Sequence, residues 1–181
     1  MKFFRQLMLS IVFAFLAAGL VFADGETKKN ESDSTQNAEV KNAEIDWISY
    51  DEGLLKAKKE SKHVFIDFTT SWCGWCKKMD KETFSRPEVI ELVNKYFIPV
   101  QVDGDSKDTL DIEGFKITEQ NLTKSEFGVR GYPTFWFLKS DGTKLGNISG
   151  YRDAKSMMDA LVFVKDAKYD TTKASAPSTG K

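Results

Sequence analysis

The sequence predicts one α/β domain with a central mixed β-sheet flanked by α-helices, on three observations. A nearly continuous β-branched and aromatic run at 63–69 is followed by helical sequence and a second apolar run at 97–102, an order that implies parallel pairing. Two further runs, at 134–139 and 144–148, flank an Asp-Gly pair at 141–142 and predict an antiparallel hairpin. About 125 residues lie between the polar chain ends, which is enough for one compact core.

The N-terminus has the pattern of a secretory signal peptide at 1–23. Lys2 and Arg5 precede an apolar stretch that ends in small residues at Ala23, where cleavage is expected. An uncleaved membrane anchor is the alternative, although the apolar run is short for a span of about 20 residues. We therefore expect a periplasmic or secreted protein that is not held in the membrane after cleavage.

The segments on either side of the predicted domain are polar. Residues 24–43 predict a flexible linker and residues 168–181 a disordered C-terminal tail, which leaves the domain at 44–167. Without the signal peptide, 24 Lys and Arg stand against 27 Asp and Glu, a net charge of −3. This charge argues against nucleic acid or an anionic membrane as the partner, and a monomer is expected.

The first helices follow from capping and composition. A helix is expected over 46–59, capped by Asp46, although Gly53 weakens its pattern. After the first strand, helical composition over 73–84 places the start of a helix at residue 73. The next helix, at 87–96, carries its proline in the first turn, where the missing N–H costs nothing.

The second half of the chain begins with a polar stretch at 103–118, which predicts an irregular segment. The spacing of its aspartates lacks the glycine and the terminal glutamate of an EF-hand loop, so a solvated acidic loop is expected instead of a calcium site. These aspartates are Asp103, Asp105 and Asp108. A short helix is expected at 119–127. After the hairpin, Asp153 caps a last helix that ends near residue 168.

The only two cysteines, Cys73 and Cys76, are two residues apart at the start of a predicted helix. A disulfide across so short a loop stabilises a fold by only about 2 kcal/mol, so it is a poor staple. As a reversible redox couple the spacing is good, because the second thiol can resolve a mixed disulfide formed at the first. Unpaired N–H groups and the dipole at the helix start favour the Cys73 thiolate, while Cys76 is expected to be more shielded and to keep its proton.

The same cysteines do not predict a metal or haem site. A structural zinc site needs four ligands, and the chain offers two thiolates and His63, which we expect at a solvated strand end. Lys77 stands where haem attachment would need a histidine. No metal or organic cofactor is expected.

Four other residues are candidates for the site. Asp67 lies on an apolar strand and is expected to be a buried carboxyl with a raised pKa that exchanges a proton with Cys76 through water, unless backbone groups satisfy it at the strand end. Trp72, Trp75 and Tyr132 would surround the thiol with flat apolar surface for a protein or peptide partner, with core packing as the alternative for Tyr132.

Three motifs make the chain resemble the thioredoxin fold over about residues 46–167. They are Trp72-Cys73-Gly74-Trp75-Cys76-Lys77, Asp67 six residues before Cys73, and Phe127-Gly128-Val129-Arg130-Gly131-Tyr132-Pro133-Thr134. The stretch 77–85 is most similar to secreted thioredoxin-like domains, such as the C-terminal domain of the disulfide interchange protein DsbD. The resemblance implies that Cys73 attacks, that Cys76 resolves, and that Pro133 is a cis-proline whose neighbouring backbone pairs with substrate.

Two departures from the family pattern accompany this resemblance. Trp75 replaces the proline common in reducing thioredoxins, which leaves the redox potential open. About fifteen additional residues precede the cis-proline segment. We expect this insertion, at 104–122, to tune partner choice without carrying chemistry, and an inert surface excursion is the alternative.

These observations predict an extracytoplasmic thiol-disulfide oxidoreductase that reduces or exchanges disulfides in exported proteins and is served by a separate redox partner. Net oxidation of dithiols is one alternative, which the reduction potential would distinguish. A binding or chaperone module with non-essential thiols is another, and it predicts unchanged function when both cysteines become serine.

Overall fold

The structure is a computed structural model that describes residues 44–170. The predicted signal peptide at 1–23, the linker at 24–43 and residues 171–181 of the predicted tail lie outside the described residues. The elements in chain order are α1 (Tyr50–Glu60), β1 (His63–Thr69), α2 (Gly74–Glu82), α3 (Pro87–Tyr96), β2 (Phe97–Asp103), β3 (Thr109–Ile112), β4 (Phe115–Thr118), α4 (Glu119–Asn121), the π-helix η1 (Leu122–Glu126), β5 (Thr134–Leu138), β6 (Lys144–Ser149) and α5 (Ala154–Lys165). Within 44–170, none of the helices has the length and apolar character needed to cross a membrane.

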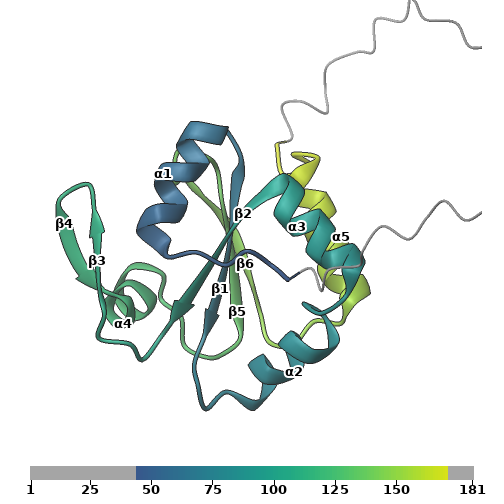
Figure 1. Ribbon diagram of the computed structural model, residues 1–181, viewed down its shortest axis with the longest axis horizontal. Helices are drawn as coiled ribbons and strands as arrows, with labels where there is room; N and C mark the ends of the chain where they lie inside the picture. Colours follow the sequence, from purple (N-terminus) through teal and green to yellow (C-terminus); the bar gives the residue numbers. More distant parts are fainter. Residues whose placement is uncertain (1–43, 171–181) are drawn as a thin grey trace, which may run out of the picture. The chain divides into compact units, whose positions relative to one another are not determined.

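A four-stranded mixed sheet in the order β2-β1-β5-β6 forms the centre of the domain. β1 pairs parallel with β2 and antiparallel with β5, which pairs antiparallel with β6. The predicted parallel pair, the hairpin and the α/β fold class are therefore confirmed. Figure 1 shows α1 and the small β3–β4 hairpin on one side of the sheet, and α3 and α5 on the other.

The core lies on both faces of β1, which explains its continuous apolar run. Phe65 faces the cluster that contains Met157 of α5, whereas Val64, Ile66 and Phe68 belong to the cluster on the α1 side. Successive side chains of a strand point to opposite faces, so a strand between two helical layers must be apolar at nearly every position. Asp67 is the exception to this rule.

The predicted helix start at Asp46 is wrong, because α1 begins at Tyr50. The segment before it runs along the outer edge of β2 instead: the Ile48 N–H donates to the Pro99 carbonyl at 3.1 Å, and the Gln101 N–H donates to the Ile48 carbonyl at 3.1 Å. This edge of the sheet satisfies backbone groups that a helix would otherwise have satisfied.

The prediction of an irregular segment at 103–118 is also wrong in part, because β3 and β4 form an antiparallel hairpin there. Its turn residues Glu113 and Gly114 have φ of 52° and 90°, the positive values that a tight two-residue hairpin turn requires. The hairpin packs through Leu110, which is buried against the α1 side of the core. Four-residue strands carry a weak local signal, and this tertiary contact stabilises them.

The remaining helices agree more closely with the prediction. The helix predicted at 119–127 is present as α4 and η1. Asp153 caps α5, as its carboxylate accepts the Ser156 N–H at 2.7 Å. The last helix ends at Lys165, three residues earlier than predicted.

The glycine in α1 has a packing role, which yields a stability prediction. A Cβ at Gly53 would lie 2.3 Å from Cγ2 of Val100, so Gly53→Ala is expected to destabilise the protein by about 2 kcal/mol, despite the roughly 1 kcal/mol that alanine gains in a helix. Gly74→Ala is the control, because a Cβ there meets no atom of the described part of the chain within 4 Å. Urea unfolding measures both, and equal stability of the two variants would contradict the packing argument.

Candidate active site

The dithiol lies at the N-terminus of α2, as predicted. β1 ends at Thr69, and after a short turn Cys73 is the N-cap of α2. Cys73 and Cys76 are joined by a disulfide, with their Cα atoms 5.3 Å apart. The Cys76 N–H donates to Cys73 Sγ at 3.0 Å, so the first sulfur occupies the position of a capping oxygen. This N–H group and the helix dipole stabilise negative charge at Cys73.

Burial does not distinguish the two cysteines in the disulfide form, since each is 3% exposed. The difference in exposure expected from the sequence is therefore not seen here. They differ instead in surroundings, because Cys76 lies one turn into the helix and lines a groove together with Thr70, Asp80 and Gln101.

Cys73 is expected to react with iodoacetamide in the reduced protein at pH 6–7 much faster than Cys76. The reason is that the helix N-terminus favours the thiolate, the reactive form, at Cys73. Mass-spectrometric mapping after a short pulse measures the two rates. Equal labelling, or faster labelling of Cys76, would contradict the assignment.

Asp67 is a buried carboxyl on the central strand, only 2% exposed. It lies opposite Gln101 of β2, and Gln101 Nε2 donates to Asp67 Oδ2 at 3.2 Å. The other oxygen, Oδ1, has no hydrogen-bond partner among residues 44–170. Burial raises the pKa of Asp67 to about 7; the Gln101 hydrogen bond opposes this rise and the charge of Asp80 adds to it. The burial and the raised pKa agree with the sequence prediction, and proton exchange with Cys76 stays a prediction.

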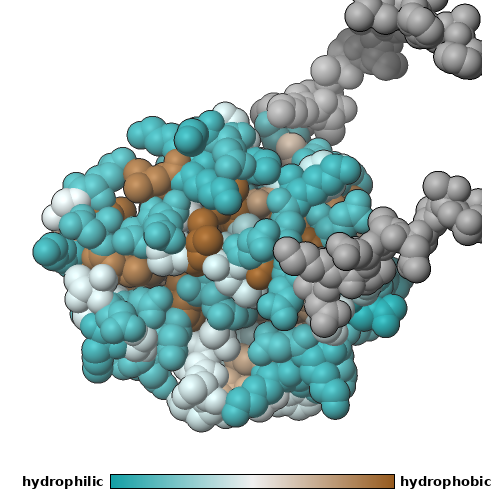
Figure 2. All heavy atoms as spheres, viewed as in Figure 1, coloured by the Kyte–Doolittle hydropathy of each residue, from teal (hydrophilic) through white to brown (hydrophobic). Residues whose placement is uncertain are grey.

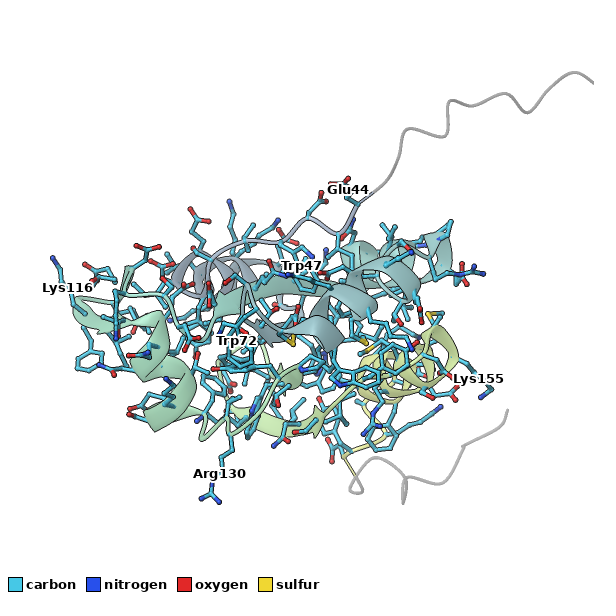
Figure 3. All side chains as sticks on the ribbon, turned by 90° about the horizontal axis from the view of Figure 1, so that it is seen from below. Glu44, Trp47, Trp72, Lys116, Arg130 and Lys155 are labelled. Atoms are coloured by element: carbon cyan, nitrogen blue, oxygen red, sulfur yellow. A yellow bond between two sulfur atoms is a disulfide. The ribbon has the colours of Figure 1, made fainter. Side chains whose placement is uncertain are left out.

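Trp72 is 66% exposed beside the dithiol, and residues far away in the sequence fix its ring. Its indole N–H donates to Asp105 Oδ2 at 2.6 Å, and its ring packs edge-on against Tyr132 with centroids 5.8 Å apart. Lys124 Nζ lies 3.5 Å from the other oxygen of Asp105. In Figure 3 Trp72 lies near the middle of the view, between the hairpin that carries Lys116 and the α5 region that carries Lys155.

The Tyr132–Pro133 peptide bond is cis, as the resemblance implied. Pairing of Thr134 with Phe68 places the start of β5 beside the end of β1. The Tyr132 hydroxyl lies against Gly104, where a Cβ would come within 1.9 Å of it. Tyr132 is therefore partly covered by the inserted segment and still contacts Trp72.

Trp75 lies between the two cysteines in the sequence, in the first turn of α2, and is 58% exposed. Its ring is 5.8 Å from that of Tyr151, and Lys78 Nζ lies 5.3 Å and 4.7 Å from the two ring centroids. The Tyr151 hydroxyl donates to Glu82 Oε2 at 2.8 Å. The exposed tryptophan is thus held by cation–π and aromatic contacts.

Several of these partners were missed by sequence reasoning. Lys78 is three residues after Trp75 on the same helix, a spacing that would have predicted the contact. Asp105 and Tyr151 have no such local signal. Gln101 is polar in an otherwise apolar strand, which is the one hint that it faces another polar group.

His63 lies away from the dithiol, at the start of β1, about 20 Å along the strand from its end. Its Nε2 is 2.6 Å from the Tyr169 hydroxyl, two residues past the predicted end of the domain. Among residues 44–170, no group of three or more His, Cys, Asp or Glu side chains is arranged to hold a metal ion. Asp105, one of the three aspartates of the acidic stretch, binds the Trp72 indole.

Comparison with known proteins agrees with this geometry. A family model described as a thioredoxin-like domain matches residues 50–165, which is 116 of the 181 residues. Disulfide bond reductase DsbH of Chlamydia pneumoniae is 27% identical over 114 residues, which cover 62% of this chain and 68% of that protein. Thiol:disulfide interchange protein DsbD of Campylobacter jejuni is 30% identical over 117 residues, 64% of this chain and 19% of that protein.

Similarity extends to a much longer protein and to a solved structure. Spermatogenesis-associated protein 20 of Rattus norvegicus is 37% identical over 68 residues, and this stretch covers 37% of this chain and only 9% of that protein. The solution structure of a thioredoxin from Thermus thermophilus superposes with a TM-score of 0.58 at 26% identity, covering 71% of this chain and 92% of that one. The thioredoxin fold predicted from the motifs is thereby confirmed.

Proposed function

The chain belongs to the thioredoxin-like domain family, and on that premise we propose that it is a thiol-disulfide oxidoreductase that reduces or exchanges disulfides in exported proteins. The observation that carries the proposal is the Cys73–Cys76 pair at the N-terminus of α2, where each cysteine directly follows an exposed tryptophan, Trp72 or Trp75. As a staple, a bond across three residues does little for stability. We infer that this disulfide serves instead as a redox couple that is reversibly reduced and reoxidised.

In the proposed reduction, the Cys73 thiolate attacks one sulfur of the substrate disulfide. A mixed disulfide forms between Cys73 and the substrate, and the second substrate sulfur leaves as a thiolate. The helix N-terminus and the Cys76 N–H favour the thiolate at Cys73 before the attack.

The second step releases the substrate. Cys76 loses its proton to the Asp67 carboxylate through water, and its thiolate attacks Cys73 Sγ. The Cys73–Cys76 disulfide closes, the remaining substrate sulfur leaves as a thiolate, and two electrons have passed from the protein to the substrate. Support for the proton route comes from the groove shared by Cys76 and Gln101, since Gln101 is bonded to Asp67. A separate redox partner must then reduce the protein again.

Recognition of the substrate is assigned to the surface around the dithiol. Trp72 and Trp75 offer exposed ring faces, and Tyr132 supports the Trp72 ring. The backbone next to the cis-Pro133 bond is the proposed pairing site for an extended substrate segment. Rings held by neighbouring side chains lose little conformational entropy on binding.

The extracytoplasmic location rests on the sequence of residues 1–23, with its basic start, its apolar stretch and its small-residue end. The linker at 24–43 and the tail from 168 onward are proposed to flank the domain without taking part in catalysis. Intact mass of the protein recovered from outside the cytoplasm tests the location, and a chain that still begins at Met1 would contradict cleavage.

A trapping experiment tests the function. Cys76→Ser removes the resolving thiol and leaves Cys73 able to attack, so mixed disulfides with exported proteins are expected to accumulate and to be released by dithiothreitol. The matched control carries both Cys73→Ser and Cys76→Ser and is expected to trap nothing. The same adducts with both variants, or none with either, would refute the proposal.

A further inference from the structure

The β3–β4 hairpin has an apolar face that the domain covers only in part. The register pairs Leu110 with Ile117 and Ile112 with Phe115, so these four side chains lie on one face. Leu110 is buried and Ile112 and Ile117 are half-buried, whereas Phe115 is 63% exposed. The uncovered part of the face is therefore at the hairpin tip.

A cleft lies beside this tip, between α1, the hairpin turn and the β5–β6 turn. Leu54 and Leu55 of α1 and Ile112 of the hairpin line it, and Leu55 is 61% exposed. Figure 2 shows brown, apolar atoms on this side of the molecule, over α1 and the hairpin. Large exposed aliphatic and aromatic side chains gathered on one surface are typical of an interaction site.

The rim of the cleft is acidic. Its lining residues include four carboxylates and one ammonium group, a net charge of −3; they are Asp51, Asp111, Glu113, Asp141 and Lys58. The whole chain without its predicted signal peptide also carries −3, so the rest of the protein is close to neutral. Lys58 Nζ lies 3.9 Å from Glu113 Oε1, and both side chains are highly exposed, so this ion pair adds little stability. Lys58 forms this pair with Glu113 and does not neutralise the three aspartates of the rim.

The hydrogen bonds of the hairpin hold the cleft in place. The Asp111 N–H donates to Asp51 Oδ2 of α1 at 3.2 Å, and the Gly114 N–H donates to Asp111 Oδ1 at 2.8 Å. The cleft with its acidic rim is thus formed without a bound partner, so binding costs less ordering entropy on this side.

The cleft is separate from the dithiol. Its β5–β6 turn residues begin at Ser140, after the end of β5, whereas Pro133 precedes the start of that strand, and the five residues of β5 between them span about 16 Å. A substrate disulfide at Cys73 does not fill it. A partner that binds both places would gain from the raised effective concentration of its second segment.

We propose that this cleft docks a short basic amphipathic segment of a partner protein. Apolar side chains of that segment pack on Leu55, which lines the cleft, and on Phe115, which lies outside the cleft lining on the same hairpin face as Ile112. Its lysine or arginine side chains pair with the carboxylates of the rim. This docking goes beyond the proposed redox chemistry and does not depend on it.

Fluorescence anisotropy tests the proposal with a labelled peptide of about twelve residues, long enough for three helical turns, built from leucines at helical i, i+3 and i+4 spacing and lysines elsewhere. Leu55→Ser and Phe115→Ser are each expected to weaken its binding to the full chain by about fivefold or more. Asp141→Asn is expected to weaken it less and to flatten its salt dependence. Phe163→Ser is the matched control, an exposed aromatic side chain on α5, and is expected to change nothing.

A second peptide, with every lysine replaced by glutamate, is expected not to bind. Equal binding of both peptides, equal weakening by Phe163→Ser, or no binding at millimolar protein would overturn the proposal. So would dimerisation of the chain that Phe115→Ser abolishes, since a second copy would then cover the cleft. Because no thiol chemistry is involved, the variant with Cys73→Ser and Cys76→Ser is expected to bind the lysine peptide equally, which separates this test from the redox one.

Discussion

Replacing Asp67 with asparagine is expected to stabilise the oxidised protein by about 4 kcal/mol at pH 8 and to have little effect at pH 4, because each pH unit between the folded and unfolded pKa values contributes about 1.4 kcal/mol. The pKa of the buried carboxyl is raised from 3.8 to about 7, so the folded protein holds this proton more tightly than the unfolded chain does. Stability from this group is fully present below pH 3.8 and is lost as the pH rises through 7. Asparagine never carries the charge.

Urea unfolding of the wild type and of Asp67→Asn between pH 4 and pH 8 measures this difference, with both proteins oxidised so that no thiol titrates. Asp141→Asn is the matched control. Asp141 is exposed, and the Thr143 N–H lowers its pKa, so its variant is expected to lose stability at neutral pH, the opposite sign. If the difference between Asp67→Asn and wild type stays constant across the pH range, the carboxyl does not titrate as described.

Replacing Cys73 with serine is expected to lower the rate of protein-disulfide reduction to that of the uncatalysed reaction. A serine hydroxyl is not ionised near neutral pH and cannot form the mixed disulfide, whereas the helix N-terminus supports a thiolate at this position. Turnover of a protein disulfide in the presence of a chemical reductant measures the loss.

Cys76→Ser is the matched comparison, because either substitution removes the same disulfide at a cost of about 2 kcal/mol. The Cys76→Ser protein is expected to attack the substrate disulfide through Cys73 and to stop at the mixed disulfide. The Cys73→Ser protein is expected to form no mixed disulfide at this position. Full function of the Cys73→Ser protein would favour a binding or chaperone role over redox chemistry. The reduction potential of the wild type then decides between net reduction and net oxidation.

Helices, strands and turns could be predicted from the sequence where neighbouring residues encode them. The continuous apolar run of β1, the Asp-Gly turn between β5 and β6, and the cap at Asp153 each depend on residues close together in the sequence. The prediction was wrong where a distant partner decides the conformation. The backbone at Ile48 pairs with the edge of β2, and the β3–β4 hairpin depends on the packing of Leu110.

The candidate site divides in the same way. The dithiol, its place at a helix N-terminus, the carboxyl six residues before it and the proline of the cis bond were predictable, because these features depend on spacing along the chain and on motifs. The side chains that surround them were not, because they come together through tertiary packing. It joined Asp105 to Trp72 across 33 residues and Gln101 to Asp67 across 34, and it brought the hairpin tip beside the cleft that Leu55 lines. Many polar side chains of the chain are able to make such hydrogen bonds, and only the packing of strands and helices selects the pair that meets.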